Sequence, residues 1–81
     1  MERKEIFASV KEIAVEVLAV EADEVKEESS FKDDLNADSL DLVEFVMSLE
    51  EKFEVSIPEE EVEGVDTIGK AIDLVESKLK G

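Results

Sequence analysis

The sequence contains no cysteine and no histidine. Without cysteine the chain can form no disulfide, no thiolate nucleophile and no cysteine-based zinc site. Without either residue the common Ser-His-Asp and Cys-His nucleophile systems are excluded, so any catalysis would depend on Asp, Glu and Lys. A chain of 81 residues also offers little room for a deep cleft. We therefore expect a non-catalytic protein without a metal site.

Positive charge is scarce as well. Lys and Arg number 9 against 24 Asp and Glu, which gives a formal net charge of -15. This charge excludes nucleic acid as a partner, disfavours anionic membranes and favours proteins with basic patches. Long apolar runs are absent too, and residues 2–5 are all charged, so we expect neither a signal segment nor membrane insertion. The expected protein is soluble, cytoplasmic and monomeric.

Apolar residues make up 43% of the chain and recur at helical spacing in its first half. This spacing predicts a helix over residues 2–19 and a second over residues 39–53, with Asp38 or Ser39 as the N-cap of the second. Residues 20–38 lose the period and form a long loop, which we expect to be functional rather than to carry an extra turn of helix. Three isolated apolar residues pin this loop to the core: Val25, Phe31 and Leu35.

Two further helices follow. Pro58 starts a short one, which Gly64 closes in a left-handed conformation. Thr67 caps the last helix, whose apolar stripe consists of Ile68, Ala71, Ile72, Val75 and Leu79. The expected fold is all-α: a four-helix bundle with three longer helices, one short helix and a long first loop, in a single domain over residues 1–81.

The second predicted helix has two apolar faces. One suffices for the core: Leu42, Phe45, Val46, Leu49 and Phe53. On nearly the opposite side, Leu40, Val43 and Met47 share a face among glutamates. Scattered exposed apolar residues need no functional explanation. Three of them at i, i+3 and i+7, surrounded by carboxylates, favour a surface that a basic and hydrophobic partner groove recognises.

Ser39 stands at the start of this helix. A serine there commonly caps the helix, but a phosphate on its oxygen would also be favoured by free N–H groups and the positive end of the helix dipole. The surrounding residues decide between the two roles. Residues 34–41, Asp-Leu-Asn-Ala-Asp-Ser-Leu-Asp, resemble the Asp-Ser-Leu attachment motif of acyl carrier proteins. The similarity covers nearly the whole chain: it is strong over residues 31–60 and weaker elsewhere, where it is mostly one of helical pattern, as in residues 67–74, which resemble the last helix of the family.

This resemblance implies that Ser39 receives 4'-phosphopantetheine from coenzyme A, through a separate magnesium-dependent phosphopantetheinyl transferase, which makes the chain a phosphoprotein. The thiol of that arm would carry acyl chains as thioesters. The glutamate-rich stretch over residues 50–61 most resembles free-standing carriers of type II fatty acid biosynthesis. The implied partners are then the acyl transferase, ketoacyl synthase, reductase and dehydratase enzymes of that pathway.

The resemblance also implies two sets of site residues. The surface met by partner enzymes would consist of Asp38, Leu40, Asp41, Val43, Glu44, Met47, Glu50 and Glu51. A channel that shelters the acyl chain would be lined by Phe31, Leu49, Ile57, Val62, Val65 and Ala71. By pattern alone, this second set is ordinary core, so its assignment to a channel rests on the resemblance.

Two residues depart from the common family pattern. Asn36 stands where a glycine often precedes the motif, and asparagine tolerates the left-handed backbone that glycine would supply. Leu42 replaces a small polar residue, and its bulk could reshape the interior and the preference for chain length. The carboxylates of Asp34, Asp38 and Asp41 crowd the region around Ser39, which leads to the hypothesis of a weak divalent cation site.

Other functions remain open from the residues alone. Asp34, Asn36 and Asp38 match the first, third and fifth positions of an EF-hand loop, but Ser39 replaces the glycine of position six and Phe45 the glutamate of position twelve. An acidic helical docking protein without a prosthetic group is compatible with the composition. A carrier of a polyketide or specialised lipid pathway is a further alternative, whereas peptide-synthetase carriers are less acidic. No spacing singles out a carboxylate pair for acid-base catalysis.

Overall fold

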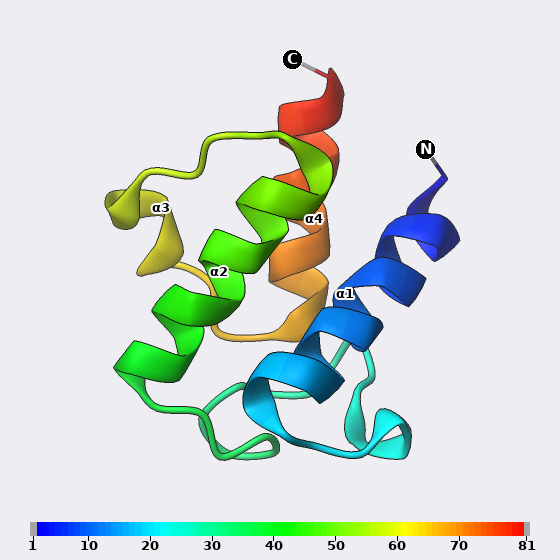
Figure 1. The fold of residues 1–81 in the computed structure, drawn as a ribbon, viewed down its shortest axis with the longest axis vertical. Helices are drawn as coiled ribbons and strands as arrows, with labels where there is room; N and C mark the ends of the chain where they lie inside the picture. Colours follow the sequence, from blue (N-terminus) through cyan, green and yellow to red (C-terminus); the bar gives the residue numbers. More distant parts are fainter. Residues whose placement is uncertain (1, 81) are drawn as a thin grey trace.

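The computed structural model of the protein describes residues 2–80 and is all-α (Figure 1). The longer helices are α1 (Arg3–Leu18), α2 (Ser39–Phe53) and α4 (Ile68–Lys80); α3 (Glu59–Val62) has a single turn, and the first loop contains a 3-10 turn, η1 (Ala22–Glu24). Helix α1 packs against both α2 and α4, and α3 lies beside α2 (Figure 1). The predicted four-helix architecture is confirmed.

The helix ends differ from the prediction mainly in where the left-handed backbone occurs. Helix α1 ends at Ala19 (φ 55°) and α2 at Glu54 (φ 54°), both in the left-handed region. The prediction for Gly64 is wrong, because no glycine among residues 2–80 has a positive φ. The Gly64 N–H instead bonds to the carbonyl of Glu61 at 3.2 Å, so α3 ends by tightening into a right-handed turn.

A single apolar core lies between the helices. Its helical members are Ile6, Val10, Ile13 and Ala14 from α1, Phe45, Val46, Leu49 and Phe53 from α2, and Ile68, Ala71, Ile72 and Val75 from α4. The predicted stripe of α4 is wrong at Leu79, which is 40% exposed because it lies a full turn beyond Val75, the last buried position. None of the helices between residues 2 and 80 has the length and apolar character that a membrane span requires.

The long first loop crosses the end of the bundle at which α2 begins (Figure 1). As predicted, its three apolar side chains, Val25, Phe31 and Leu35, are buried. The expectation that the loop carries no extra turn of helix is wrong, because η1 occupies residues 22–24. This turn shortens the span that must run without regular backbone bonds.

Backbone hydrogen bonds fasten the loop to the start of α4. The Phe31 N–H donates to the carbonyl of Asp66 at 3.0 Å, and the Gly69 N–H donates to that of Glu27 at 2.8 Å. A Cβ at position 69 would lie only 3.0 Å from the Glu27 oxygen, so this close approach favours glycine. The loop therefore holds the segment before α2 at a fixed place against α4.

Candidate functional site

Ser39 is the first residue of α2, and its side chain is exposed. The N-cap is Asp38: its Oδ1 accepts a hydrogen bond from the Asp41 N–H at 2.9 Å, and the Asp41 Oδ2 accepts one from the Asp38 N–H at 3.3 Å. This capping box performs the task that a serine performs at many helix starts. The Ser39 hydroxyl is therefore not used as the cap.

The backbone around Ser39 suits an anion. The N–H groups of Ser39 and Leu40 lack acceptors within α2, as the first N–H groups of any helix do, and no other acceptor among residues 2–80 takes their place. They lie at the positive end of the helix dipole, which stabilises negative charge in the first turn. A phosphodiester on the Ser39 oxygen would meet these donors, so the residues present fit such a group.

The turn before Ser39 depends on Asn36, which has a left-handed backbone with φ 55°. The prediction that asparagine accepts this conformation in place of glycine is thus confirmed. Just after it, the Ala37 N–H donates to the carbonyl of Phe31 at 2.6 Å, and Ala37 is buried. This tight turn leads the chain out of the core and leaves Ser39 at the surface.

A hollow of about 320 Å³ opens beside Ser39. Its lining residues are Phe31, Lys32, Ala37, Asp38, Ser39, Leu42, Val65 and Asp66. Within this lining, the ring of Phe31 packs on that of the buried Phe45 with centroids 5.1 Å apart. Leu42 is half-buried in this wall, so the departure noted in the sequence does shape the surroundings of Ser39. Sequence reasoning missed Lys32 and Asp66, which no local pattern connects to Ser39.

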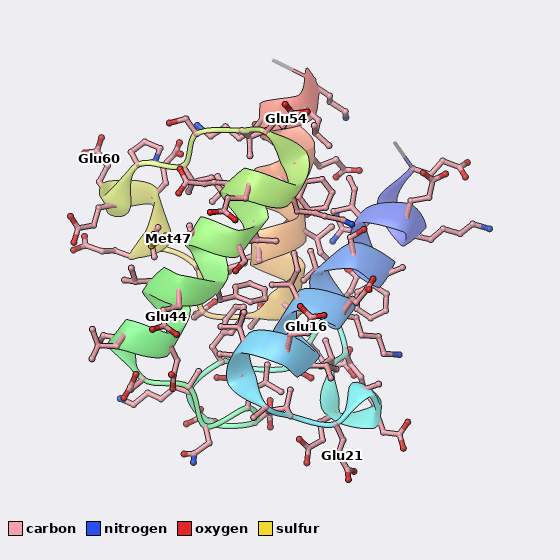
Figure 2. The ribbon with its side chains drawn as sticks, in the orientation of Figure 1. Glu16, Glu21, Glu44, Met47, Glu54 and Glu60 are labelled. Atoms are coloured by element: carbon pink, nitrogen blue, oxygen red, sulfur yellow. The ribbon has the colours of Figure 1, made fainter. Side chains whose placement is uncertain are left out.

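The outward face of α2 is apolar in its middle and acidic at its edge. Leu40, Val43 and Met47 are 75%, 41% and 54% exposed, as their spacing predicted. Figure 2 shows Glu44 and Met47 on the same outward side of α2, with Glu60 on the neighbouring α3. Glu44 and Glu51 are exposed, whereas Glu50 is half-buried. The eight residues predicted to meet partners all lie on α2 or its cap, and their role stays a prediction.

A second hollow, of about 280 Å³, lies between α2 and α3. It is lined by Val43, Val46, Met47, Glu50, Ile57, Glu59 and Val62. All six predicted channel residues are buried in one core. Ile57 and Val62 also line this hollow, and Phe31 and Val65 line the one beside Ser39. Leu49 and Ala71 lie in the closed core, so the structure brings the set together without showing an open channel.

Comparisons with known proteins agree with this geometry. Residues 8–75 match the family model described as the phosphopantetheine attachment site. The acyl carrier protein of Sulfurovum sp. (strain NBC37-1) is 54% identical over 72 residues, which cover 89% of this chain and 96% of that protein. This chain belongs to the acyl carrier protein family. The acyl carrier protein of Wolinella succinogenes is also 54% identical over 72 residues, covering 89% of this chain and 95% of its own length.

Solved structures of acyl carrier proteins share the fold. The protein from Thermotoga maritima superposes with a TM-score of 0.86 at 38% identity, covering 99% of this chain and 93% of that one. The protein from Enterococcus faecalis has a TM-score of 0.78 at 40% identity and covers 96% of this chain and 99% of its own. The cofactor of the chain is accordingly 4'-phosphopantetheine.

The carboxylates around the acyl carrier motif do not form the cation site considered from the sequence. Asp34 Oδ2 accepts a hydrogen bond from the Ser30 N–H at 2.6 Å, whereas Asp38 and Asp41 bind each other's backbone. Within residues 2–80, no group of three or more His, Cys, Asp or Glu side chains is placed to hold a metal ion. The sequence placed these carboxylates near one another, but each has a local backbone donor.

Proposed function

We propose that this chain carries acyl intermediates as thioesters on 4'-phosphopantetheine attached to Ser39, and passes them between the enzymes of fatty acid biosynthesis. The observation that supports this proposal is the state of Ser39. Its side chain is exposed, the capping role belongs to Asp38, and two backbone N–H groups beside it have no acceptor within residues 2–80. Residues 1–81 act as one carrier domain, without catalysis of their own, as a monomer in the cytoplasm.

Attachment is a transfer from coenzyme A, carried out by a separate phosphopantetheinyl transferase with magnesium. The Ser39 oxygen forms a bond to the phosphorus on the pantetheine side and gives up its proton. The bond from that phosphorus to the bridging oxygen breaks, and adenosine 3',5'-bisphosphate leaves with the electron pair. The N–H groups of Ser39 and Leu40 are the donors that would hold the phosphodiester anion. When bound, the group supplies a terminal thiol on which an acyl chain forms a thioester.

The partners are the transferase and the acyl transferase, ketoacyl synthase, reductase and dehydratase enzymes of the pathway. Their basic patches would meet the carboxylates of the eight α2 and cap residues predicted to meet partners. The exposed apolar residues of the same set would contact the apolar part of the partner's groove. Charge complementarity of this kind mainly accelerates encounter and fixes orientation. The net charge of -15 gives the attraction a long reach at low salt.

Intact mass spectrometry tests the attachment. The full chain is incubated with coenzyme A, magnesium and a broad-specificity phosphopantetheinyl transferase, together with Ser39→Ala and Ser56→Ala. Ser56 is exposed after the end of α2 and serves as the matched control. We expect a gain of one phosphopantetheine unit in the wild type and in Ser56→Ala, and none in Ser39→Ala. No gain in an unmodified wild-type chain would leave an acidic docking protein without a prosthetic group.

The pathway needs a second measurement, because a polyketide or specialised lipid carrier would pass the first one. The modified protein is offered to a malonyl transferase and a ketoacyl synthase of type II fatty acid synthesis. Transfer of the malonyl group followed by condensation supports the fatty acid assignment. Modification without either step would assign the chain to another pathway.

A further inference from the structure

The hollow beside Ser39 has a single basic residue in its lining. This residue is Lys32, and the charged residues that share the lining with it are Asp38 and Asp66. Lys32 is exposed and makes no ion pair within residues 2–80. Its positive charge is therefore available to an anion that is added at this hollow.

The two aspartates of the lining have other partners. Asp38 Oδ1 accepts a hydrogen bond from the Asp41 N–H at 2.9 Å. Asp66 Oδ1 forms an ion pair with Lys70 Nζ of α4 at 3.1 Å. Neither carboxylate is paired with Lys32, so the lysine and the aspartates of the hollow do not neutralise one another.

The first loop holds the backbone of Lys32 in place. On one side, the Phe31 N–H donates to the carbonyl of Asp66 at 3.0 Å, and the side chain of Phe31 is buried. On the other side, the Leu35 N–H donates to the carbonyl of Ser30 at 3.0 Å and closes the turn that contains Lys32. The capping box fixes the start of α2 in the same way. The lysine and the attachment serine thus extend from two fixed segments into one hollow.

We infer that Lys32 is a positioning residue for the phosphopantetheine arm, and that its ammonium group pairs with the phosphodiester on Ser39. The phosphodiester adds one negative charge to a chain whose net charge is already -15, directly beside a cap made of two aspartates. A cation in the hollow offsets this repulsion, in addition to the free N–H groups and the dipole of α2. The inference rests on the proposed attachment at Ser39.

The pair holds the attached end of the arm beside the hollow, while the thiol end remains free to reach partner enzymes. Lysine suits this role because its ammonium is a point charge on a flexible stem and follows a phosphate without one fixed geometry. The apolar wall formed by Leu42 and Val65 lies along the same hollow. Lys32 therefore restricts the directions in which the arm leaves the surface of the protein.

Thermal unfolding of the full chain, with and without the arm, tests the pair. For each variant we measure the difference in melting temperature between the loaded and the unloaded chain. In Lys32→Gln this difference should be about 1–5 °C less favourable to the loaded chain than in the wild type, as expected for an exposed ion pair in a domain of this size. Lys32→Arg keeps the charge and should behave as the wild type does.

Lys52→Gln is the matched control. Lys52 is exposed in the last turn of α2, makes no ion pair within residues 2–80 and does not line the hollow beside Ser39. Its replacement changes the net charge as Lys32→Gln does, and the difference between loaded and unloaded chain should stay that of the wild type. Equal differences in Lys32→Gln and Lys52→Gln overturn the inference.

Phosphorus NMR of the loaded chain gives a second readout at the group itself. The phosphodiester resonance should shift in Lys32→Gln at low salt and stay in place in Lys52→Gln. At 1 M sodium chloride the wild type and Lys32→Gln should converge, because salt screens an exposed pair. One resonance position in all variants at low salt contradicts the pair.

Intact mass spectrometry of every variant separates this inference from the proposed attachment. A wild-type chain that takes up no phosphopantetheine overturns the attachment and, with it, the role of Lys32. A chain that is loaded at Ser39 but shows neither the thermal difference nor the phosphorus shift overturns the role of Lys32 alone.

Discussion

Asp38 and Asp41 hold each other's backbone at the start of α2, through hydrogen bonds of 2.9 and 3.3 Å. Both residues also belong to the predicted partner surface. Their carboxylates therefore have a structural role beside any role in docking. A variant that removes one of them changes the first turn of the helix that presents Ser39, so loss of the cap and loss of charge must be separated.

Asp38→Ala and Asp38→Asn make this separation. Alanine removes the cap and should lower the free energy of unfolding by about 1 kcal/mol, whereas asparagine caps about as well as aspartate and should leave it nearly unchanged. Urea unfolding of the two variants measures the difference. If modification of Ser39 slows only in Asp38→Ala, the cap matters; if it slows equally in Asp38→Asn, the charge matters. Equal stability of the two variants would contradict the capping role.

Asn36 offers a test of backbone strain two residues before the cap. Its φ of 55° lowers the folding stability of most residues that have a side chain by about 1–2 kcal/mol. Asparagine loses less than this, whereas a β-branched residue loses the full amount. Asn36→Gly should therefore keep the stability of the wild type, and Asn36→Val should lose about 1–2 kcal/mol. Thermal unfolding followed by circular dichroism measures both. A valine variant as stable as the glycine variant would show that the turn has rearranged.

The sequence predicted the features that depend on neighbours along the chain. The limits of α2, the cap at Thr67 and the left-handed Asn36 follow from period, capping preference and local sterics, and all three were predicted correctly. Features that join distant segments were not predicted. The bond from Ile57 to Glu50 and the place of Lys32 beside Ser39 depend on how helices pack, and no periodicity encodes them.

The left-handed helix ends are a second case in which packing, and not local residue preference, decides the backbone conformation. Residue preference assigned such an end to Gly64, yet the structure has it at Ala19 and Glu54. A longer helix that must turn back over the core can impose this backbone on an unfavourable residue, because packing outweighs a cost of about 1–2 kcal/mol. The short α3 does not have to turn back over the core in this way, so Gly64 keeps a backbone with negative φ.

Charge reversal on α2 tests the docking surface directly. Glu44→Lys and Glu16→Lys change the net charge equally, but Glu44 lies on α2 beside Met47 whereas Glu16 lies on α1 (Figure 2). If the transferase docks on α2, the initial rate of modification at low salt should fall about five- to tenfold in Glu44→Lys and much less in Glu16→Lys. The difference should shrink with added salt. Equal rates in the two variants would place the docking surface elsewhere.

Arg3 is the hub of an ion network that closes the bundle far from Ser39. Its guanidinium contacts the carboxylates of Glu27 in the loop at 2.6 Å, and of Asp73 and Glu76 on α4 at 2.7 and 3.1 Å. The hydrogen bond to Glu27, and then that to Asp73, raise the pKa of Arg3 above its ordinary value. The network joins the first turn of α1 to segments that are distant in sequence.

Removing this hub should lower the melting temperature. Arg3→Ala loses all three contacts, whereas Arg3→Lys keeps the charge without the planar fork that engages several carboxylates, so it should lie between alanine and the wild type. Lys4→Ala is the matched control, because Lys4 is exposed on the same turn and makes no ion pair within residues 2–80. Differential scanning calorimetry at low salt and at 1 M sodium chloride measures the effect, which screening should reduce.

The raised pKa fixes the dependence of this effect on pH. A group whose pKa is raised by folding stabilises fully below its unfolded pKa and loses that contribution only as pH rises through the folded value. For Arg3 both values lie above the working range, so the difference in melting temperature between wild type and Arg3→Ala should be the same at pH 7 and pH 9. A difference that disappears at pH 9, or a Lys4→Ala variant that melts as low as Arg3→Ala, would show that general charge balance stabilises the bundle and that the Arg3 contacts do not.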